Sequence, residues 1–466
     1  MFDLTVEFCQ GNGKCLYEQI YEYVRGEIRE GKLRPGERLP STRSLAEYLQ
    51  VSRSTATLAY DQLLSEGYIS SRPYRGYYVC RMEELYRLDD GESSGGVEAA
   101  DAGTCCAVDF SPTATDMSRF PFSVWRKINR NVLGEGSAGL FAQGDPQGEY
   151  SLRETIGRYL HSSRGVNCSP QQIIVGAGND YLLLLLEKIL GRQVRIAMEN
   201  PTYKRAYQIF RSFPYEITTV DMDESGMTVS GLRQSDATAA YVMPSHQYPT
   251  GVLMPIGRRL ELLKWANEAP GRYLIEDDYD SEFRYRGKPI PSLQASDAQG
   301  RVIYMGTFSK SIAPAIRVSY MVLPRELLER YRRQCYFYSA TVSRVDQKVL
   351  EIFMGEGYFE RYLNKMRKRY REKHDLMLEG LSEFQEDFRI TGENAGLHLL
   401  LTGRKGQTEH ALVSSAQALG VRVYGLSESL VGKEEGEQSH TVLLGYGGLE
   451  LEDIKKGLTL LRQAWL

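Results

Sequence analysis

The chain has 466 residues, of which 42% are apolar and 25% are charged. This length exceeds what a single hydrophobic core usually supports, and the composition excludes a disordered or fibrous protein. The net charge of −3 neither indicates nor excludes a nucleic-acid partner, because it averages over domains.

Composition divides the chain into three parts. We expect a first domain at residues 12–80, a flexible acidic linker at 81–107 and a larger domain at 108–466. The linker contains LDDGESSGGVEAADAG, which has too few apolar residues to fold. Seven scattered cysteines without a Cys-x-x-Cys pair argue against disulfides or a metal site. Without a signal peptide or a membrane-length apolar run, the sequence predicts a cytoplasmic protein that makes no membrane contact.

The first part has the pattern of a small helical domain with a β-wing. Apolar residues recur at helical spacing from Leu16 onward, and Ser41 and Ser52 stand where the N-caps of two further helices belong. Short strands near 68–71 and 76–79 flank a turn. This order is typical of a winged helix-turn-helix, whose third helix enters the major groove of DNA.

Residues 33–72, LRPGERLPSTRSLAEYLQVSRSTATLAYDQLLSEGYISSR, resemble the DNA-binding domain of the GntR family of bacterial regulators. The resemblance implies a double-stranded DNA operator as partner. The residues it places near DNA are Arg43, Ser52, Arg53, Thr55, Thr57 and Arg75. The family usually has Gly-Ser-Gly at the wing tip, whereas this chain has Tyr-Arg-Gly at 74–76, which makes the wing contact less firmly implied. A three-helix unit used only for packing or dimerisation is the alternative, which the continuous motif disfavours.

From residue 108 onward, strand-like and helical patterns alternate, which predicts an α/β domain with a mostly parallel sheet. One apolar strand, 302–305, leads to Thr307, Ser309, Lys310 and, seven residues later, Arg317. A lysine at the carboxyl end of a buried strand lies where such sheets bind ligands, and desolvation there lowers its pKa. An arginine can bind a phosphate through two parallel hydrogen bonds.

Two further strands end in residues that suit the same ligand. Strand 273–275 runs into three carboxylates at 276–278, which repel one another unless one meets a cation such as a protonated ring nitrogen. Strand 173–175 leads through a glycine-rich turn to Gly178 and Asn179 at the start of a helix, where free N–H groups can bind phosphate. Each signal is weak alone. Together they predict a site for pyridoxal 5′-phosphate (PLP).

The ordered motifs ENPTY, SHQYPTG, EDDYDSEF and GTFSKSIAPAIRVSY resemble the aminotransferase-like domain of the MocR/GabR regulators. Those proteins fuse a GntR-type domain to a fold-type-I PLP domain, which includes a smaller α+β C-terminal subdomain, and the likeness spans essentially the whole chain. It implies that Lys310 forms the Schiff base with PLP, that Asp277 pairs with the pyridine nitrogen and that Tyr279 lies near the phenolic oxygen. It also implies ring stacking by Tyr203, phosphate binding by Arg317, Gly178 and Asn179, and secondary phosphate contacts by Thr307 and Ser309.

Two positions depart from true aminotransferases. The Asn that commonly helps to hold the phenolic oxygen is replaced within the segment 248–251, and Leu443 stands where many of those enzymes place an arginine for the substrate carboxylate. We take Arg205 as the candidate for binding an effector carboxylate and Arg422 as a weaker one, although either could be structural. We interpret His246 as a hydrogen-bonded residue at the pocket edge and not as a general base.

The combined expectation is a transcriptional regulator that forms a domain-swapped homodimer and senses PLP itself, a small amine or an amino acid through a PLP Schiff base. We expect no physiological turnover. The first alternative is an active PLP-dependent aminotransferase with a DNA-binding appendage. The second is a repressor whose large domain binds a ligand without PLP.

Overall fold

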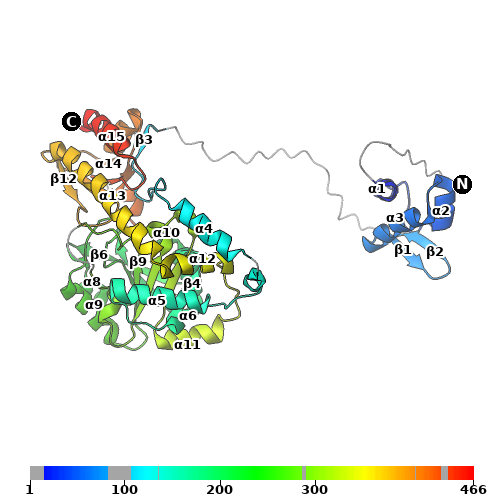
Figure 1. Ribbon diagram of the computed structural model, residues 1–466, viewed down its shortest axis with the longest axis horizontal. Helices are drawn as coiled ribbons and strands as arrows, with labels where there is room; N and C mark the ends of the chain where they lie inside the picture. The colour runs from blue at the N-terminus through cyan, green and yellow to red at the C-terminus, as the bar shows by residue number, and fades with distance from the viewer. Residues whose placement is uncertain (1–14, 82–105, 135, 286–289, 405, 432–438) are drawn as a thin grey trace. The chain divides into compact units, whose positions relative to one another are not determined.

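A computed structural model of the chain describes residues 15–81, 106–134, 136–285, 290–404, 406–431 and 439–466. The chain divides into two compact units, Met1–Gly103 and Thr104–Leu466, whose elements are labelled in Figure 1. Most of the expected linker, residues 82–105, lies outside the described ranges, as do residues 12–14 of the expected first domain.

The first unit is a three-helix domain followed by a two-stranded hairpin. Its elements are α1 (Leu16–Arg29), α2 (Thr42–Leu49), α3 (Arg53–Ser65), β1 (Ile69–Arg72) and β2 (Gly76–Val79). As expected, Ser41 Oγ accepts a hydrogen bond from Ser44 N at 3.1 Å, and so caps α2. Between α2 and α3, Gln50 takes a left-handed conformation with φ of +53°, which makes the turn tight.

Each helix of the first unit contributes an apolar stripe to one shared core, in which α3 packs against both α1 and α2. The buried stripe residues are Ile20, Val24 and Ile28 of α1, Leu45 and Ala46 of α2, and Ala56, Ala59, Tyr60 and Leu63 of α3. The hydroxyl of the fully buried Tyr60 donates to the carbonyl oxygen of Pro40 at 3.1 Å, which satisfies its polar end. This arrangement is the predicted winged helix-turn-helix.

The second unit is built on an eight-stranded sheet in the order β4-β11-β10-β9-β8-β5-β6-β7. Its strands are β4 (Ile173–Gly176), β5 (Arg195–Asn200), β6 (Glu216–Asp223), β7 (Gly226–Met227), β8 (Ala239–Val242), β9 (Tyr273–Asp278), β10 (Val302–Thr307) and β11 (Ser319–Val322). The pairings from β10 through β9, β8 and β5 to β6 are parallel, whereas β11 is antiparallel to both β10 and β4. The sheet is therefore mostly parallel, as predicted.

Helices cover both faces of this sheet (Figure 1). They are α4 (Phe122–Val132), α5 (Tyr150–Arg164), α6 (Asn179–Leu190), α7 (Lys204–Arg211), α8 (Val229–Gln234), α9 (Ile256–Asn267), α10 (Phe308–Ser311), α11 (Arg325–Gln334), α12 (Arg344–Gly355) and α13 (Tyr358–Leu381). Side chains alternate along each strand: Ile303 and Met305 of β10 pack with α6 and α11, whereas Tyr304 packs with α5 and α12. Burial on both faces explains why these strands are continuous apolar runs in the sequence.

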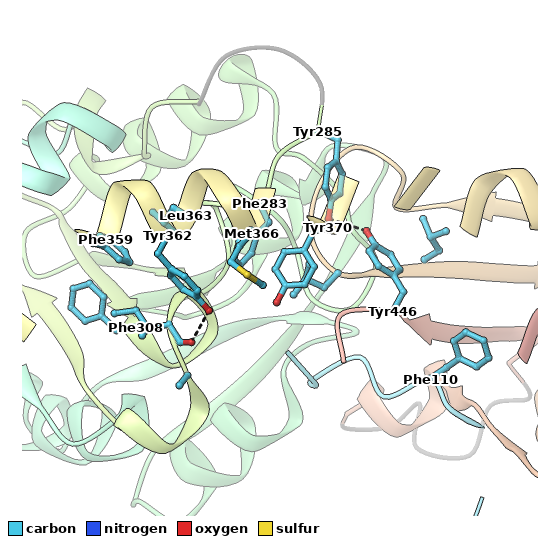
Figure 2. Close-up of a cluster of buried hydrophobic side chains, with 14 of the residues drawn as sticks. Phe110, Phe283, Tyr285, Phe308, Phe359, Tyr362, Leu363, Met366, Tyr370 and Tyr446 are labelled. Atoms are coloured by element: carbon cyan, nitrogen blue, oxygen red, sulfur yellow. Dashed lines mark hydrogen bonds between the residues drawn. The ribbon is translucent and has the colours of Figure 1, made fainter. Parts of the chain in front are cut away.

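The C-terminal subdomain is a smaller sheet with two helices. Its elements are β12 (Phe388–Thr391), β13 (His398–Gly403), α14 (Glu409–Ala418), β15 (Tyr424–Gly425), β16 (Thr441–Gly445) and α15 (Leu451–Trp465), and nearby β3 (Val108–Asp109) pairs in parallel with β14 (Val421–Arg422). Figure 2 shows how α13 joins this part to the large sheet. The buried side chains of Phe359, Tyr362, Met366 and Tyr370 follow one another along the helix, and the Tyr446 hydroxyl of the small subdomain contacts the Tyr285 hydroxyl at 3.1 Å.

The register of the large sheet decides which residues meet at its edge. Asp277 of β9 lies opposite Met305 of β10, so the carboxyl ends of these two parallel strands reach the same edge. On the other side of β10, Thr307 pairs with Ser319 of β11, which in turn pairs with Gly176 of β4. The three segments that carry the predicted site residues therefore end side by side. Among the described helices, none has the length and apolarity that crossing a bilayer requires.

Candidate functional site

The residues predicted to approach DNA lie on the surface of the first unit, on α2, on α3 and on the wing. The side chains of four are exposed and those of two are partly buried: Arg43, Ser52, Arg53 and Arg75 in the first group, and Thr55 and Thr57 in the second. α3 begins at Arg53, so its free N–H groups and positive dipole end lie beside an exposed guanidinium. This combination is suited to a DNA phosphate.

Two of these residues also stabilise the start of α3. Ser52 Oγ accepts a hydrogen bond from Thr55 N at 3.1 Å and lies 2.7 Å from Thr55 Oγ1. Both side chains therefore belong to the N-cap of α3, which fixes where this helix starts. Sequence reasoning predicted the cap as well as the DNA contact, and the geometry is compatible with both.

The wing tip has an unusual backbone. Tyr74 is fully exposed and has a φ of +60°, a conformation that bulky side chains rarely adopt. Arg75 beside it is exposed, whereas the Arg72 guanidinium lies over the Tyr78 ring at 4.6 Å from its centroid. One arginine of the wing is therefore held by the hairpin and one projects from its tip.

In the second unit, the carboxyl edge of the sheet encloses a cavity of about 180 Å³. All nine residues that sequence reasoning assigned to PLP line it, together with Arg205. The lining residues are Thr113, Gly178, Asn179, Asp180, Tyr203, Arg205, Met243, Tyr248, Asp277, Tyr279, Thr307, Ser309, Lys310, Pro314 and Arg317. Residues separated by up to about 200 positions in the chain are thus brought into one pocket by the parallel strands.

Lys310 follows β10 on the short helix α10 and is partly buried. Its Nζ atom donates hydrogen bonds to the carbonyl oxygens of Thr113 at 2.9 Å and Pro112 at 3.3 Å. Burial lowers the pKa of the Lys310 amine to about 8, against a smaller opposing effect of the Asp280 carboxylate. A larger fraction of this amine than of an ordinary lysine is therefore uncharged near neutral pH, and the uncharged form can act as a nucleophile.

Asp277, the residue before the last of β9, lines the pocket and is 5% exposed. It accepts hydrogen bonds from the Tyr241 hydroxyl and from Asn179 Nδ2, the latter at 3.3 Å. Burial raises the pKa of Asp277 to about 6, and the hydrogen bond from Tyr241 acts in the opposite direction. In the described part of the chain, no ion pair joins this carboxylate to a lysine or arginine, so it is available for a cationic ligand atom.

The opposite end of the pocket carries the positive charge. Gly178 is the N-cap of α6, and the Arg317 guanidinium packs directly against its α-carbon. Asp180 in the first turn of α6 accepts from Arg317 at 3.1 Å and from Arg205 at 2.5 Å. Helix N–H groups and a guanidinium, the two kinds of donor from which anion sites are commonly built, therefore lie together at this position.

Three tyrosines form the wall between these ends. The Tyr203 and Tyr248 rings meet edge to face with centroids 5.8 Å apart, and the rings of Tyr248 and Tyr279 are 6.1 Å apart. The Tyr279 hydroxyl lies 2.8 Å from Nδ1 of His246, which is 2% exposed. His246 is therefore a buried, hydrogen-bonded residue behind the pocket wall, and not a free base in the cavity.

Sequence reasoning missed five lining residues: Thr113, Asp180, Met243, Tyr248 and Pro314. Asp180 had a usable signal, because an acidic residue beside a predicted phosphate site repels the phosphate unless a cation lies between them. Thr113 had none, since nothing local links it to Lys310. Arg422 does not line the pocket; it is exposed, and its guanidinium lies over the Tyr424 ring. Leu443 is buried on β16 and is not a lining residue either.

Both units match known families. Residues 16–79 match the model "Bacterial regulatory proteins, gntR family", and residues 114–431 match the model "Aminotransferase class I and II". The uncharacterized HTH-type transcriptional regulator YdeL of Bacillus subtilis is 40% identical over 97% of this chain and 96% of its own length. The probable rhizopine catabolism regulatory protein MocR of Rhizobium meliloti is 31% identical over 97% of this chain and 94% of its own. This chain belongs to the MocR-type transcriptional regulators.

As a MocR-type regulator, the protein is a DNA-binding transcriptional regulator in which a GntR helix-turn-helix is fused to an aminotransferase-like domain. The solved structure of a multiple substrate aminotransferase from Thermococcus profundus matches with a TM-score of 0.69 and 26% identity, over 78% of this chain and 92% of that one. The regulator therefore has the fold of the class I and II aminotransferases, a family that depends on PLP.

Proposed function

We propose that this regulator binds PLP in the pocket at the carboxyl edge of the sheet. Either PLP is itself the signal, or the bound PLP senses a small amine or an amino acid. One observation carries the proposal. A low-pKa lysine, a buried carboxylate without a cation and a guanidinium at a helix N-terminus line the same cavity, as Lys310, Asp277 and Arg317.

The residues present fit the group at both of its polar ends. At the ring-nitrogen end, Asp277 is a buried acid whose partners are neutral, and a bound cation would favour its ionised form. At the phosphate end, a side chain on Gly178 would enter the space of Arg317, so the glycine lets the guanidinium lie against the N-terminal end of α6, beside its free N–H groups.

When bound, PLP supplies an aldehyde that combines reversibly with amines and a ring that withdraws electrons. The chain supplies everything else. The Lys310 amine would be the attachment point, Asp277 would hold the ring nitrogen protonated, and the Tyr279 hydroxyl would bind the phenolic oxygen. Tyr203 would stack on the ring. The residues we assign to phosphate binding are Arg317, Gly178, Asn179, Thr307 and Ser309.

An effector that carries a carboxylate requires a cation near the pocket mouth. Arg205 is 56% exposed at its side chain and shares the Asp180 carboxylate with Arg317. If Arg317 turns to a phosphate, Asp180 is left with Arg205 alone. We propose Arg205 as the residue that binds an effector carboxylate, with Asp180 fixing its position.

The contact of Lys310 with Pro112 and Thr113 offers a route from the pocket towards the linker. These two residues lie in the segment between β3 and α4, close to the start of the second unit. Once the Lys310 nitrogen is engaged elsewhere, it no longer holds both carbonyls, and this segment gains freedom. We propose that ligand binding in the pocket acts on the linker 81–107 by weakening the contact of Lys310 with Pro112 and Thr113. It can favour one domain arrangement only as far as the energy of this contact differs between the arrangements.

Two further properties complete the proposal. Domains of this fold form sites between subunits, so we propose a domain-swapped homodimer in which two winged helices bind two operator half-sites, with Arg43, Ser52, Arg53, Thr55, Thr57 and Arg75 facing DNA. Because its ligand is chromosomal DNA, we place the protein in the cytoplasm.

A borohydride experiment tests the cofactor. The purified protein should show the visible absorption of a protonated imine, and reduction followed by peptide mass analysis should yield a pyridoxyl group on Lys310. The Lys310→Ala variant should lack both signals. A wild-type protein without any pyridoxyl peptide would refute the proposal and favour a repressor that works without PLP.

One observation also favours a second function, that of a working aminotransferase: the low pKa of Lys310 suits proton transfer as well as attachment. An amino-acid panel with a keto-acid acceptor distinguishes the two. We expect spectral changes with selected amines but no sustained turnover. Many turnovers for each molecule of protein would establish the enzyme.

A further inference from the structure

The tip of the wing presents a large aromatic ring to solvent. Tyr74 is fully exposed, whereas the other three tyrosines of this part of the chain, Tyr68, Tyr77 and Tyr78, are partly buried. Among the described residues, none makes a hydrogen bond or a ring contact with the Tyr74 side chain. The first unit therefore does not use this ring for its own packing.

The backbone at this position is one that glycine normally supplies. Arg75 N donates to the Arg72 carbonyl oxygen at 3.0 Å, which closes a four-residue turn. Pro73 is its second residue, and Tyr74, with a φ of +60°, is its third. This is the pattern of a type II turn, whose third residue needs a positive φ and is usually glycine or asparagine. Because a tyrosine strains such a turn, its presence points to a role outside the domain.

Positive charge without acidic partners surrounds the ring. Residues 67–81 contain no aspartate or glutamate. Arg72 and Arg75 belong to the turn, and the Arg38 side chain lies beside Gly76, where an added Cβ atom would be 3.6 Å from its Nε atom. Within the described part of the chain, no ion pair neutralises any of these three arginines. An aromatic ring among free cations is suited to a nucleic acid.

The wing folds back along α3. The strand β1 starts just beyond Gly67, after the end of α3, but the Tyr77 ring of the hairpin meets the ring of Tyr60 edge to face at 4.8 Å between centroids. Tyr60 lies seven residues before Gly67, or about 10 Å back along the helix. The tip lies beyond this contact, towards the N-terminal half of α3, which carries Arg53. This is the half of a recognition helix that reaches base edges in the major groove.

A tip beside the recognition helix meets the neighbouring minor groove. That groove is about 6 Å wide and 7.5 Å deep, so it admits one side chain but not a hairpin. We infer that Tyr74 enters the minor groove as a wedge against a base step, while Arg75 contacts the flanking phosphates. The inference rests on the proposed DNA-facing surface of the first unit. It also goes beyond the family resemblance, because the usual Gly-Ser-Gly tip has no ring.

A wedge makes Tyr74 a specificity-determining residue. An inserted ring partly unstacks the step that it enters, and this costs least at the flexible pyrimidine–purine steps TA and CA/TG. The chain would thus select a deformable step beside the sequence that α3 contacts, without a hydrogen bond to any base edge there.

The first experiment measures affinity by fluorescence anisotropy, with the full chain and a duplex selected from a random library. Tyr74→Gly and Tyr74→Asn both suit a positive φ, so the turn should relax, yet affinity should fall about tenfold because one aromatic contact with the bases is lost. The slope of log affinity against log salt should stay at the wild-type value, since no charge is removed. Tyr74→Phe keeps the ring and should bind within about twofold of wild type.

Two further variants separate the ring from charge and from general exposure. Arg75→Ala should weaken binding and also lower the salt slope by about one. Tyr48→Ala removes another exposed tyrosine of the first unit, on α2. Because Tyr48 lies five residues after Arg43, it projects about 140° away around the helix. This variant should bind like wild type.

The second experiment locates the step. Duplexes selected by the wild type should be enriched in a TA or CA/TG step at one fixed distance from the α3 site, and selection by Tyr74→Gly should lose this enrichment. A 2-aminopurine base placed in that step should gain fluorescence when the wild type binds, because unstacking relieves its quenching. Tyr74→Gly should leave the fluorescence unchanged.

The outcomes are distinguishable. A wild-type protein that binds no duplex in a salt-dependent manner would refute the proposed DNA-facing surface itself. Wild-type affinity in both Tyr74→Gly and Tyr74→Asn, or an equal loss in Tyr74→Phe, would refute the role of the ring and leave the α3 contact intact. Unchanged 2-aminopurine fluorescence with the wild type would refute insertion.

Discussion

A Cβ atom added to Gly178 would lie 2.6 Å from the Arg317 guanidinium, so the glycine at the start of α6 and the arginine after β10 are in direct contact. Both residues also have a positive φ, +91° for Gly178 and +51° for Arg317. A substitution at Gly178 therefore has to move the Arg317 guanidinium.

This contact predicts the effect of Gly178→Ala. The methyl group should displace Arg317 and lower PLP affinity by at least tenfold, because a charge-assisted phosphate contact is worth about 1.5–3 kcal/mol. Gly191→Ala at the other end of α6 is the matched control, since Gly191 has a φ of +88° but no neighbour within 4 Å. Both variants are strained, and only the first should lose cofactor in equilibrium dialysis. Equal loss in both would show that backbone strain alone is responsible.

The buried carboxylate of Asp277 gives a second prediction. Asp277→Asn keeps the shape of the side chain and removes the negative charge that we propose pairs with the ring nitrogen. The dissociation constant for PLP should therefore rise about 10- to 100-fold. Fluorescence or absorbance during dialysis measures this. Asp223→Asn, on the exposed end of β6 and paired with Arg258, serves as a control that should retain cofactor. Unchanged retention in Asp277→Asn would contradict the role of this carboxylate.

Recognition of DNA can be tested on α3. Arg53→Ala should weaken binding to an operator selected from random duplexes about 10- to 100-fold, and a reduced salt dependence would identify a phosphate contact. Arg29→Ala, also exposed but on α1, should bind like wild type. Fluorescence anisotropy over a salt series is the measurement. Equal loss in both variants would indicate a non-specific charge effect.

The segment 110–118, which contains the carbonyls that contact Lys310, is anchored by a buried ion pair. Lys373 Nζ contacts Asp116 Oδ2 at 2.7 Å, and the two side chains are 0% and 2% exposed. Asp116→Asn should cost about 3–5 kcal/mol, because it leaves the Lys373 charge buried without its partner, whereas Lys373→Met should cost less, because Arg369 Nε still lies 3.6 Å from Asp116 Oδ2. The double variant should recover part of this loss in denaturant unfolding. Additive losses would mean that the pair is not energetically coupled.

Glu199 predicts a pH dependence of stability. This residue is fully buried, and burial raises its pKa to about 7 from an ordinary 4.5. The unfolded chain releases the proton first, so Glu199 supports the folded state fully below about pH 4.5, and this support is lost as pH rises to about 7. Glu199→Gln should therefore gain thermal stability relative to wild type between pH 5 and pH 8, by at most about 3 kcal/mol. A constant difference across this range would contradict the raised pKa.

Local sequence determined most of the fold and the types of residue in the site. Apolar runs buried on both sheet faces, serine caps and glycine turns act within a few residues, so the winged helix-turn-helix and the strand ends that carry Lys310 and Asp277 could be predicted. The same holds for Gly178, because a glycine before a helix is a local signal.

Only the tertiary structure decided which distant side chains complete the site. The contact of Lys310 with Thr113, the hydrogen bond from Tyr241 to Asp277, the Asp180 carboxylate shared by Arg205 and Arg317, and the buried His246–Asp280 pair join segments that no local pattern connects. The physical reason is that parallel strands bring their carboxyl ends to one edge, whereas the loops beyond that edge are placed by packing. Sequence spacing specifies the first of these and not the second.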